Sequence, residues 1–149
     1  MIEARPTDQS NRGNRGISID LQEHNKKIVV QHFHELVNEK NVTDIAKTFL
    51  SDFVDHEGPN GEPIGVEEDK ARMTGLAARF PDLHVDLRDV IAEDDKVVVR
   101  GIWTGTDSKT GKRMEFHGFV LWRIENGRFA ERWATATTPS VMSGLDILW

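Results

Sequence analysis

The second half of the chain contains four consecutive segments that are typical of β-strands. They are rich in Val, Ile, Phe and Trp, are separated by acidic or glycine-containing turns, and cover Leu83–Ala92, Lys96–Gly105, Glu115–Ile124 and Arg128–Thr137. Consecutive strands joined by short turns form an antiparallel meander. The chain must therefore build its fold around a sheet of this kind.

The first half shows helical periodicity instead. Apolar residues recur at helical spacing from Asp20 onward, again in Thr43–Leu50, and a third time in Val66–Phe80, which Pro81 ends. Helices that precede a run of strands predict an α+β domain, in which about three N-terminal helices cover one face of a strongly curved antiparallel sheet. Residues 1–19 lack this periodicity and are predicted to form a flexible arm, which leaves 20–149 as a single domain.

Composition excludes several classes of function. The net charge of −6 argues against a nucleic-acid-binding protein, which normally carries a basic face. The chain has no cysteine, so thiolate chemistry, cysteine metal sites and disulfides are excluded. No apolar run approaches the roughly 20 residues that span a bilayer, and the start of the chain lacks the apolar core of a signal peptide. We therefore expect a soluble, cytoplasmic protein without a membrane partner.

The turn between the last two strands decides which side chains share a face of the sheet, because a shift of one residue reverses every side chain. A two-residue Asn126-Gly127 turn would place His117 and Glu131 on opposite faces. A three-residue Glu125–Gly127 loop with a left-handed glycine would place them on the same face. We predict the three-residue loop, because it interleaves a carboxylate and an imidazole with large apolar groups, as a pocket requires.

Five side chains share that predicted face: His117, Phe119, Leu121, Glu131 and Trp133. Glu131 would lie roughly 13 Å along the ladder from the partner of His117, so the two would contact different atoms of one ligand. Apolar neighbours should raise the pKa of Glu131 above its ordinary value of about 4.3. A solvated Glu131 and a purely structural His117 are the alternatives.

The opposite face of the same hairpin is also apolar. It carries Phe116, Val120, Trp122 and Ile124, which is more apolar surface than a monomer normally exposes. We expect a homodimer to cover this back of the sheet.

The run Asp55-His56-Glu57 resembles a metal cluster, but adjacent residues diverge and cannot easily converge on one ion. We therefore predict no metal site and interpret His56 as a substrate-contacting residue at the mouth of the cavity. The chain offers no glycine-rich phosphate loop either, so no cofactor is expected.

Three short motifs occur in a fixed order along the chain. They are Val54-Asp55-His56, Phe80-Pro81-Asp82-Leu83 and Ile124-Glu125-Asn126-Gly127. Together they resemble the SnoaL-like polyketide cyclases of the nuclear-transport-factor-2-like superfamily, over about Glu23 to Thr138. The resemblance implies a cone-shaped α+β barrel whose sheet and covering helices enclose an apolar cavity, usually without a cofactor and often within a homodimer.

The resemblance also implies roles for individual residues. In these cyclases an acidic residue on the last long strand acts as acid/base, and a histidine on the preceding strand contacts the substrate; the matching positions are Glu131 and His117. The family usually has aspartate where this chain has Glu131, which moves the carboxylate by one methylene. Phe119, Leu121 and Trp133 would line the substrate site beside them.

These observations lead to one main hypothesis and two alternatives. The main hypothesis is a cofactor-independent SnoaL-like enzyme that performs acid/base chemistry on a mid-sized apolar carbonyl compound, by aldol-type polyketide cyclisation or a related isomerisation. The alternatives are a non-catalytic small-molecule-binding protein of the same fold and a protein-interaction module. Dehydratase and hydroxylase activities remain open within the enzyme class.

Overall fold

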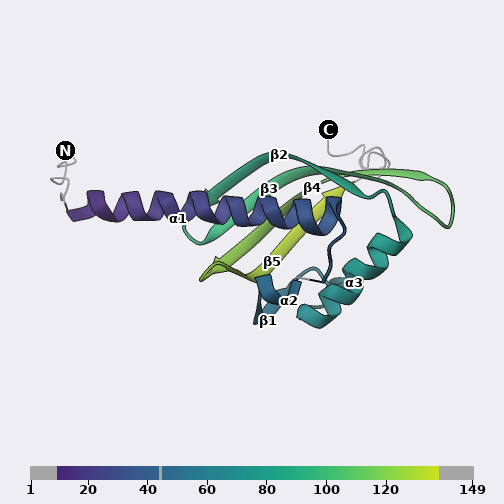
Figure 1. Ribbon diagram of the computed structural model, residues 1–149, viewed down its shortest axis with the longest axis horizontal. Coiled ribbons are helices and arrows are strands. Elements are labelled where there is room, and N and C mark those ends of the chain that lie inside the picture. The colour runs from purple at the N-terminus through teal and green to yellow at the C-terminus, as the bar shows by residue number, and fades with distance from the viewer. Residues whose placement is uncertain (1–9, 44, 138–149) are drawn as a thin grey trace, which may run out of the picture.

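The computed structural model describes residues 10–43 and 45–137. The described part of the chain begins with a long helix, α1 (Ser10–Phe33), which continues as a π-helical segment, η1 (His34–Asn38). Two shorter helices follow, α2 (Ile45–Thr48) and α3 (Val66–Arg79), with a 3₁₀ turn, η2 (Pro59–Gly61), between them. Figure 1 shows α1 lying along one face of the sheet and projecting beyond it at the N-terminal end.

Within the described residues, five strands form one curved, open sheet in the order β1-β5-β4-β3-β2. The strands are β1 (Phe49–Asp55), β2 (His84–Glu93), β3 (Lys96–Thr106), β4 (Arg113–Glu125) and β5 (Arg128–Thr137). The last four form an antiparallel meander, whereas β1 pairs with β5 in parallel and makes the sheet mixed. The predicted α+β class, with helices covering one face of a curved sheet, is confirmed (Figure 1).

The core lies between the helices and the concave face of the sheet. From the helices it receives Val29, Phe33, Leu36 and Val37, and from the strands Phe49, Val97, Val99, Trp122, Ile124 and Phe129, all at most 6% exposed. Alternation along each strand places these residues on one face of the sheet. The packed layer of aromatic and branched side chains thus fixes which face of the sheet is inside.

The hairpin between β4 and β5 differs from the predicted one. Asn126 and Gly127 have φ angles of 50° and 76°, and Glu125 pairs with Arg128, so the turn has two residues. The prediction of a three-residue loop was wrong. The register then shifts, because Arg123 and Ile124 pair with Glu131 and Phe129, which leaves Ala130 as an extra residue in a β-bulge. That extra residue restores the shared face of His117 and Glu131.

Several element boundaries also differ from the prediction. The first helix begins at Ser10 rather than Asp20, so only residues 1–9 of the predicted arm lie outside the described residues. The predicted helix Thr43–Leu50 shrinks to the single turn of α2, because the chain enters β1 at Phe49. The third helix and the four meander strands occur where the periodicity predicts them, within two residues.

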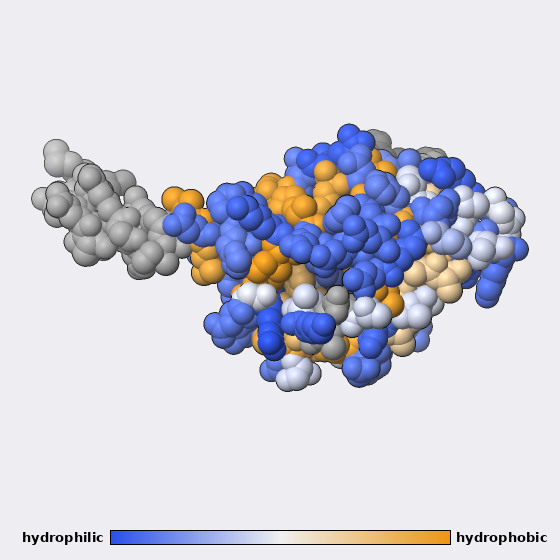
Figure 2. All heavy atoms as spheres, viewed as in Figure 1, coloured by the Kyte–Doolittle hydropathy of each residue, from blue (hydrophilic) through white to orange (hydrophobic). Residues whose placement is uncertain are grey.

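The surface beside α1 is largely hydrophilic, with apolar side chains gathered near the middle of that helix (Figure 2). Ile19 and Leu21 are 58% and 51% exposed there. Among the described helices, none is long and apolar enough to cross a membrane.

Candidate active site

A pocket of about 140 Å³ lies between α3, the end of α1 and the concave face of the sheet. Its walls are mostly apolar and include Phe33, Leu36, Met73, Leu76, Trp103, Phe116, Val120, Trp122 and Ala134. Four residues with ionisable or permanently charged side chains belong to this lining, namely His32, Asp69, Arg72 and Arg132. We call this cavity the inner pocket. An apolar cavity that holds a few polar groups is the usual form of a small-molecule site.

Helical spacing explains how α3 brings charge into the inner pocket. Asp69, Arg72, Met73 and Leu76 follow one another at intervals of three, one and three residues, so they share one face of α3. That face is turned towards the sheet, because all four residues line the pocket. Asp69 is consequently only 3% exposed although it stands in the first turns of the helix.

Two carboxylates and two guanidinium groups meet at the edge of the pocket. Arg72 donates through Nη2 to Asp55 Oδ2 and to Asp69 Oδ1, both at 2.5 Å. Arg132 donates through Nη1 to the two carboxylate oxygens of Asp55 at 3.1 and 3.0 Å. We call these four residues the charge cluster. They come from β1, α3 and β5, and Asp55 can reach Arg132 because the parallel pairing sets the two residues opposite each other.

The two carboxyl groups of the cluster have different proton affinities. Burial disfavours the charged form of Asp55, but Arg132, the backbone N–H of Glu57 and Arg72 outweigh burial and hold its pKa below the ordinary value. For Asp69 burial dominates, and with the nearby Asp55 it raises the pKa to about 6 against the opposing effect of Arg72. A pair of acids whose pKa values are pushed apart is a common acid/base arrangement. Asp69 is the member that exchanges a proton near neutral pH.

His32 forms the wall of the pocket at the end of α1. Its ring lies 4.6–5.6 Å from the rings of Phe33, Phe49, Trp122 and Phe129, measured between centroids. Burial, assisted by the positive charge of Arg132, lowers its pKa from 6.5 to about 3. His32 is therefore a neutral, packed imidazole at physiological pH.

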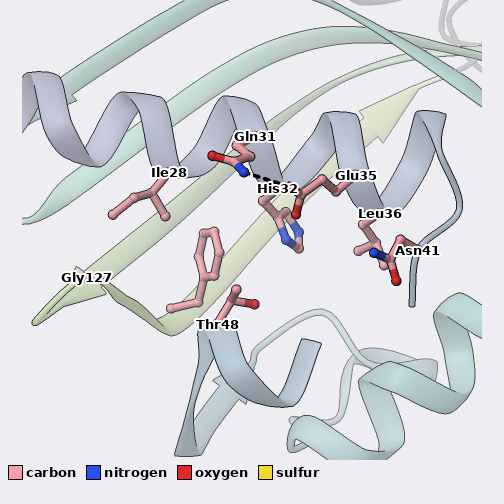
Figure 3. Close-up of a pocket in the computed structure, with 9 residues that line it drawn as sticks. Ile28, Gln31, His32, Glu35, Leu36, Asn41, Thr48 and Gly127 are labelled. Atoms are coloured by element: carbon pink, nitrogen blue, oxygen red, sulfur yellow. Dashed lines mark hydrogen bonds between the residues drawn. The ribbon is translucent and has the colours of Figure 1, made fainter. Parts of the chain in front are cut away.

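A second cavity, of about 200 Å³, lies on the other side of His32. Figure 3 shows His32 and Leu36 pointing from the helix towards α2, which carries Thr48. Gln31 donates a hydrogen bond of 2.6 Å to Glu35 beside this cavity (Figure 3). His32 thus separates two cavities, and the charge cluster lies at the edge of the inner pocket.

The structure places Glu131 away from the inner pocket. Its carboxylate accepts a 2.5 Å hydrogen bond from Arg123 Nε and lies 3.1 Å from His56 Nε2, on the outer face of the sheet. The ring of His56 in turn stacks on Trp133 with centroids 4.6 Å apart. The hydrogen bond from Arg123, assisted by His56, lowers the pKa of Glu131 despite partial burial. The predicted rise in that pKa was wrong, because a guanidinium occupies the site expected to be apolar.

The other predicted site residues share this outer face but are spread along it. His117 lies opposite Thr137, six positions beyond Glu131, or roughly 20 Å along the strand. The side chain of His117 is 52% exposed beside Glu115, and Phe119 is 51% exposed. Leu121 pairs with Trp133, and both are half-buried. The structure therefore brings His56, Glu131 and Trp133 together and leaves His117 apart.

The two faces of the hairpin are exchanged relative to the prediction. Val120, Trp122 and Ile124 were expected at a dimer interface, yet they are buried beneath the helices at 2–4% exposure. Phe116 packs against the same core, with its ring stacked on Trp103. The face expected to line the pocket is the outer one. Both faces carry large apolar groups, and the packing of α1 selects between them.

Sequence reasoning missed the charge cluster although one signal for it was present. Asp69 and Arg72 share the apolar stripe of α3 with Met73 and Leu76, and charged residues in such a stripe must be paired. The acidic residues in the first turn of this helix also suit the helix dipole, which accounts for them without a buried partner and hides the signal. Among the described residues, no group of three or more His, Asp or Glu side chains is arranged to hold a metal ion.

Comparison with known proteins agrees with this architecture. A family model described as SnoaL-like polyketide cyclase matches residues 27–142. A candidate polyketide cyclase from Acidithiobacillus ferrooxidans is 25% identical, with a TM-score of 0.69 over 83% of this chain and 95% of its own. AclR, a candidate hydroxylase from Streptomyces galilaeus, is 21% identical, with a TM-score of 0.71 over 84% of this chain and 86% of its own.

IdmH, a candidate polyketide cyclase from Streptomyces antibioticus, is 22% identical, with a TM-score of 0.69 over 81% of this chain and 99% of its own. At these identities the last two proteins demonstrate the shared fold alone. No curated protein matches the chain at a significant level.

Proposed function

Because the chain belongs to the SnoaL-like polyketide cyclase family, we propose that it is a cofactor-independent enzyme that performs acid/base chemistry on a neutral carbonyl compound in the inner pocket. The observation that carries this proposal is Asp69. Its carboxyl group is almost fully buried beside Arg72 at the edge of a mostly apolar pocket, and its pKa of about 6 lies near the working pH, as a general acid/base requires.

The proposed reaction begins with removal of a proton. The ionised carboxylate of Asp69 takes a proton from the carbon beside the carbonyl group, the C–H bond breaks, and its electron pair moves onto the carbonyl oxygen to give an enolate. Where a C=C bond is conjugated with the enolate, return of the proton to the far carbon of that bond shifts the double bond and completes an isomerisation. Attack of the enolate carbon on a second carbonyl carbon, whose oxygen then takes the proton from Asp69, completes an aldol-type ring closure.

Pocket size favours one of these outcomes. The inner pocket measures about 140 Å³, and an apolar cavity of roughly 150 Å³ is enough for a benzene-sized ligand. Drug-sized ligands occupy pockets of roughly 300–1,000 Å³. The volume therefore favours enolisation or isomerisation of a compound with one ring over cyclisation of a long chain.

A proton-exchange assay tests the proposal without knowledge of the natural substrate. Cyclohexanone is incubated with the protein in heavy water, and replacement of its α-hydrogens by deuterium is followed by NMR. We expect catalysed exchange in the wild type and a loss of about 10²-fold or more in Asp69→Asn, since general acid/base catalysis contributes roughly 10²–10⁴-fold. Glu68→Gln, which removes the exposed neighbouring acid on α3, is the matched control.

The same assay decides between the inner pocket and the outer face. The assignment of Glu131 as acid/base and His117 as substrate contact is a separate proposal that follows from the family resemblance. If Glu131→Gln abolishes exchange and Asp69→Asn does not, the chemistry belongs to the outer face and the inner-pocket proposal fails.

A non-catalytic carrier is the second candidate function. It is favoured by the hydrogen bond from Arg72, which restrains the Asp69 carboxylate. Saturable binding of cyclohexanone with no exchange above the buffer rate would support the carrier against the enzyme.

We also propose a homodimer, but through the outer face rather than the one predicted from sequence. Ile91, Val98, Leu121 and Trp133 form an apolar row across β2–β5 on that face. Ile91 is 61% exposed, and Phe119 stands beside the row. Sedimentation should therefore find a dimer that Phe119→Asp weakens, while a monomeric wild type would contradict the proposal.

A further inference from the structure

Trp122 carries a buried hydrogen-bond donor that nothing in the described part of the chain satisfies. The residue is 2% exposed, and its indole Nε1 has no hydrogen-bond partner there. Buried polar groups are almost always paired, and an unmade hydrogen bond in an interior costs about 1–3 kcal/mol. Trp122 also belongs to the lining of the inner pocket. The unsatisfied donor therefore belongs to a residue that lines the cavity, which makes it a group that an acceptor bound there could satisfy.

The charged neighbours of Trp122 are held by other residues of the charge cluster. Arg132 lies with its guanidinium carbon 5.7 Å from the centre of the indole ring, and its Nη1 donates to Asp55. Arg72 is likewise engaged by Asp55 and Asp69. The neutral His32 presents its ring edge to Trp122 in a T-shaped contact at 4.9 Å. The indole N–H of Trp122 is the donor in this lining that is fully buried and has no partner among the described residues.

Charge balance defines the class of ligand. Asp55 and Asp69 offset the positive charges of Arg72 and Arg132, so the cluster has no net charge when Asp69 is ionised. A site of this kind gives no electrostatic advantage to an anion, while its apolar walls favour a neutral molecule. An acceptor-only group, such as the oxygen of a ketone, suits a single N–H donor.

We infer that the indole N–H of Trp122 binds the carbonyl oxygen of a neutral cyclic ketone in the inner pocket. This inference rests on the proposed function and adds the group that receives the oxygen. When Asp69 removes the α-proton, negative charge develops on that oxygen, and a hydrogen bond from a preorganised donor becomes stronger at that moment. Trp122 would then select carbonyl compounds over hydrocarbons of the same shape.

Two isosteric probes test the inference. Cyclohexanone and methylenecyclohexane differ only in the replacement of C=O by C=CH₂, so the hydrocarbon has no acceptor. Indole ¹H–¹⁵N signals are recorded with each probe, and Trp122 is identified by elimination with the variants Trp103→Phe, Trp133→Phe and Trp149→Phe. We expect the Trp122 proton to move downfield with cyclohexanone and to remain in place with methylenecyclohexane.

Affinity provides a second readout. Replacement of Trp122 by 3-benzothienylalanine keeps the ring shape and removes the N–H. This replacement should weaken cyclohexanone binding about tenfold, as expected for one net hydrogen bond, and leave methylenecyclohexane binding unchanged. Should that protein fail to fold, the signals of the wild type decide the question alone.

The outcomes separate this inference from the proposed function. If cyclohexanone binds and the Trp122 signal does not move, or moves equally with both probes, the role of Trp122 is overturned and the pocket remains a ligand site. If neither probe binds, the inner pocket is not a ligand site and both proposals fail. If the signal moves as expected while Asp69→Asn retains full proton exchange, the Trp122 inference holds and the role of Asp69 fails.

Discussion

Replacement of His32 by phenylalanine should make the protein markedly more resistant to acid. The folded state holds the pKa of His32 at about 3, whereas the unfolded chain returns it to about 6.5. Between these two pKa values, His32 is therefore protonated in the unfolded chain and neutral in the folded protein. The stability that His32 contributes is fully present above pH 6.5 and is lost as the pH falls towards 3.

The magnitude follows from the size of the shift. Each pH unit below 6.5 costs about 1.4 kcal/mol, so roughly 3 kcal/mol is lost by pH 4.5. Whole domains are stable by only about 5–15 kcal/mol, which makes this a large effect. Phenylalanine suits the aromatic surroundings of His32 and has no proton to bind, and because its ring is larger than imidazole the change costs about 1–3 kcal/mol at neutral pH.

Urea unfolding at pH 7.5, 6.5, 5.5 and 4.5 measures the effect through the free energy of unfolding of each protein. We expect the difference between His32→Phe and wild type to shift by about 3 kcal/mol in favour of the variant between pH 7.5 and 4.5. His34→Gln, which removes an exposed histidine two residues later, is the matched control. Parallel pH profiles for wild type and His32→Phe, or an equal change in His34→Gln, would refute the reasoning.

Three further changes probe the charge cluster and the sheet. Asp69→Asn should gain stability relative to wild type as the pH rises from about 4 to 7, by on the order of 2 kcal/mol in urea unfolding, because a raised pKa means that the folded state resists ionisation. Gly127→Ala should cost about 1–2 kcal/mol in the same measurement, since φ at this position is +76°. Gly118→Ala should lower the melting temperature by several degrees relative to Gly75→Ala, because a Cβ at Gly118 would lie 2.6 Å from the carbonyl oxygen of Thr135, whereas a Cβ at Gly75 meets nothing within 4 Å. An unchanged melting temperature in Gly118→Ala would contradict that close contact.

The local sequence pattern was sufficient to predict the meander. Side chains alternate between the two faces along each strand, and each strand pairs with its neighbour across a short turn. The same reasoning failed at β1, whose partner β5 follows more than seventy positions later. Phe49 and Leu50 extend the helical periodicity of the preceding turn, so the pattern alone cannot locate the change from helix to strand. A strand that is defined by a distant partner leaves little trace in its own sequence.

The candidate site was misplaced for a related reason. Residues that alternate along β4 divide into two apolar sets, and nothing local distinguishes Phe119 and Leu121 from Val120 and Trp122. The choice of the inner set depends on where α1 packs. The bulge at Ala130 also could not be predicted, because an alanine does not indicate a bulge in a sequence. This extra residue decides on which face of the sheet Glu131 lies.

The contact between Asp55 and Arg132 also imposes an order of events on folding. The two residues are 77 positions apart, and Asp55 is fully buried in the finished protein. A carboxylate cannot leave water at reasonable cost before its cationic partners arrive. Closing a loop of this length is slow compared with the formation of helices and hairpins. We therefore expect β1 and α3 to dock late, on a preformed meander, so that the inner pocket is among the last parts of the molecule to be assembled and among the first to open when it unfolds.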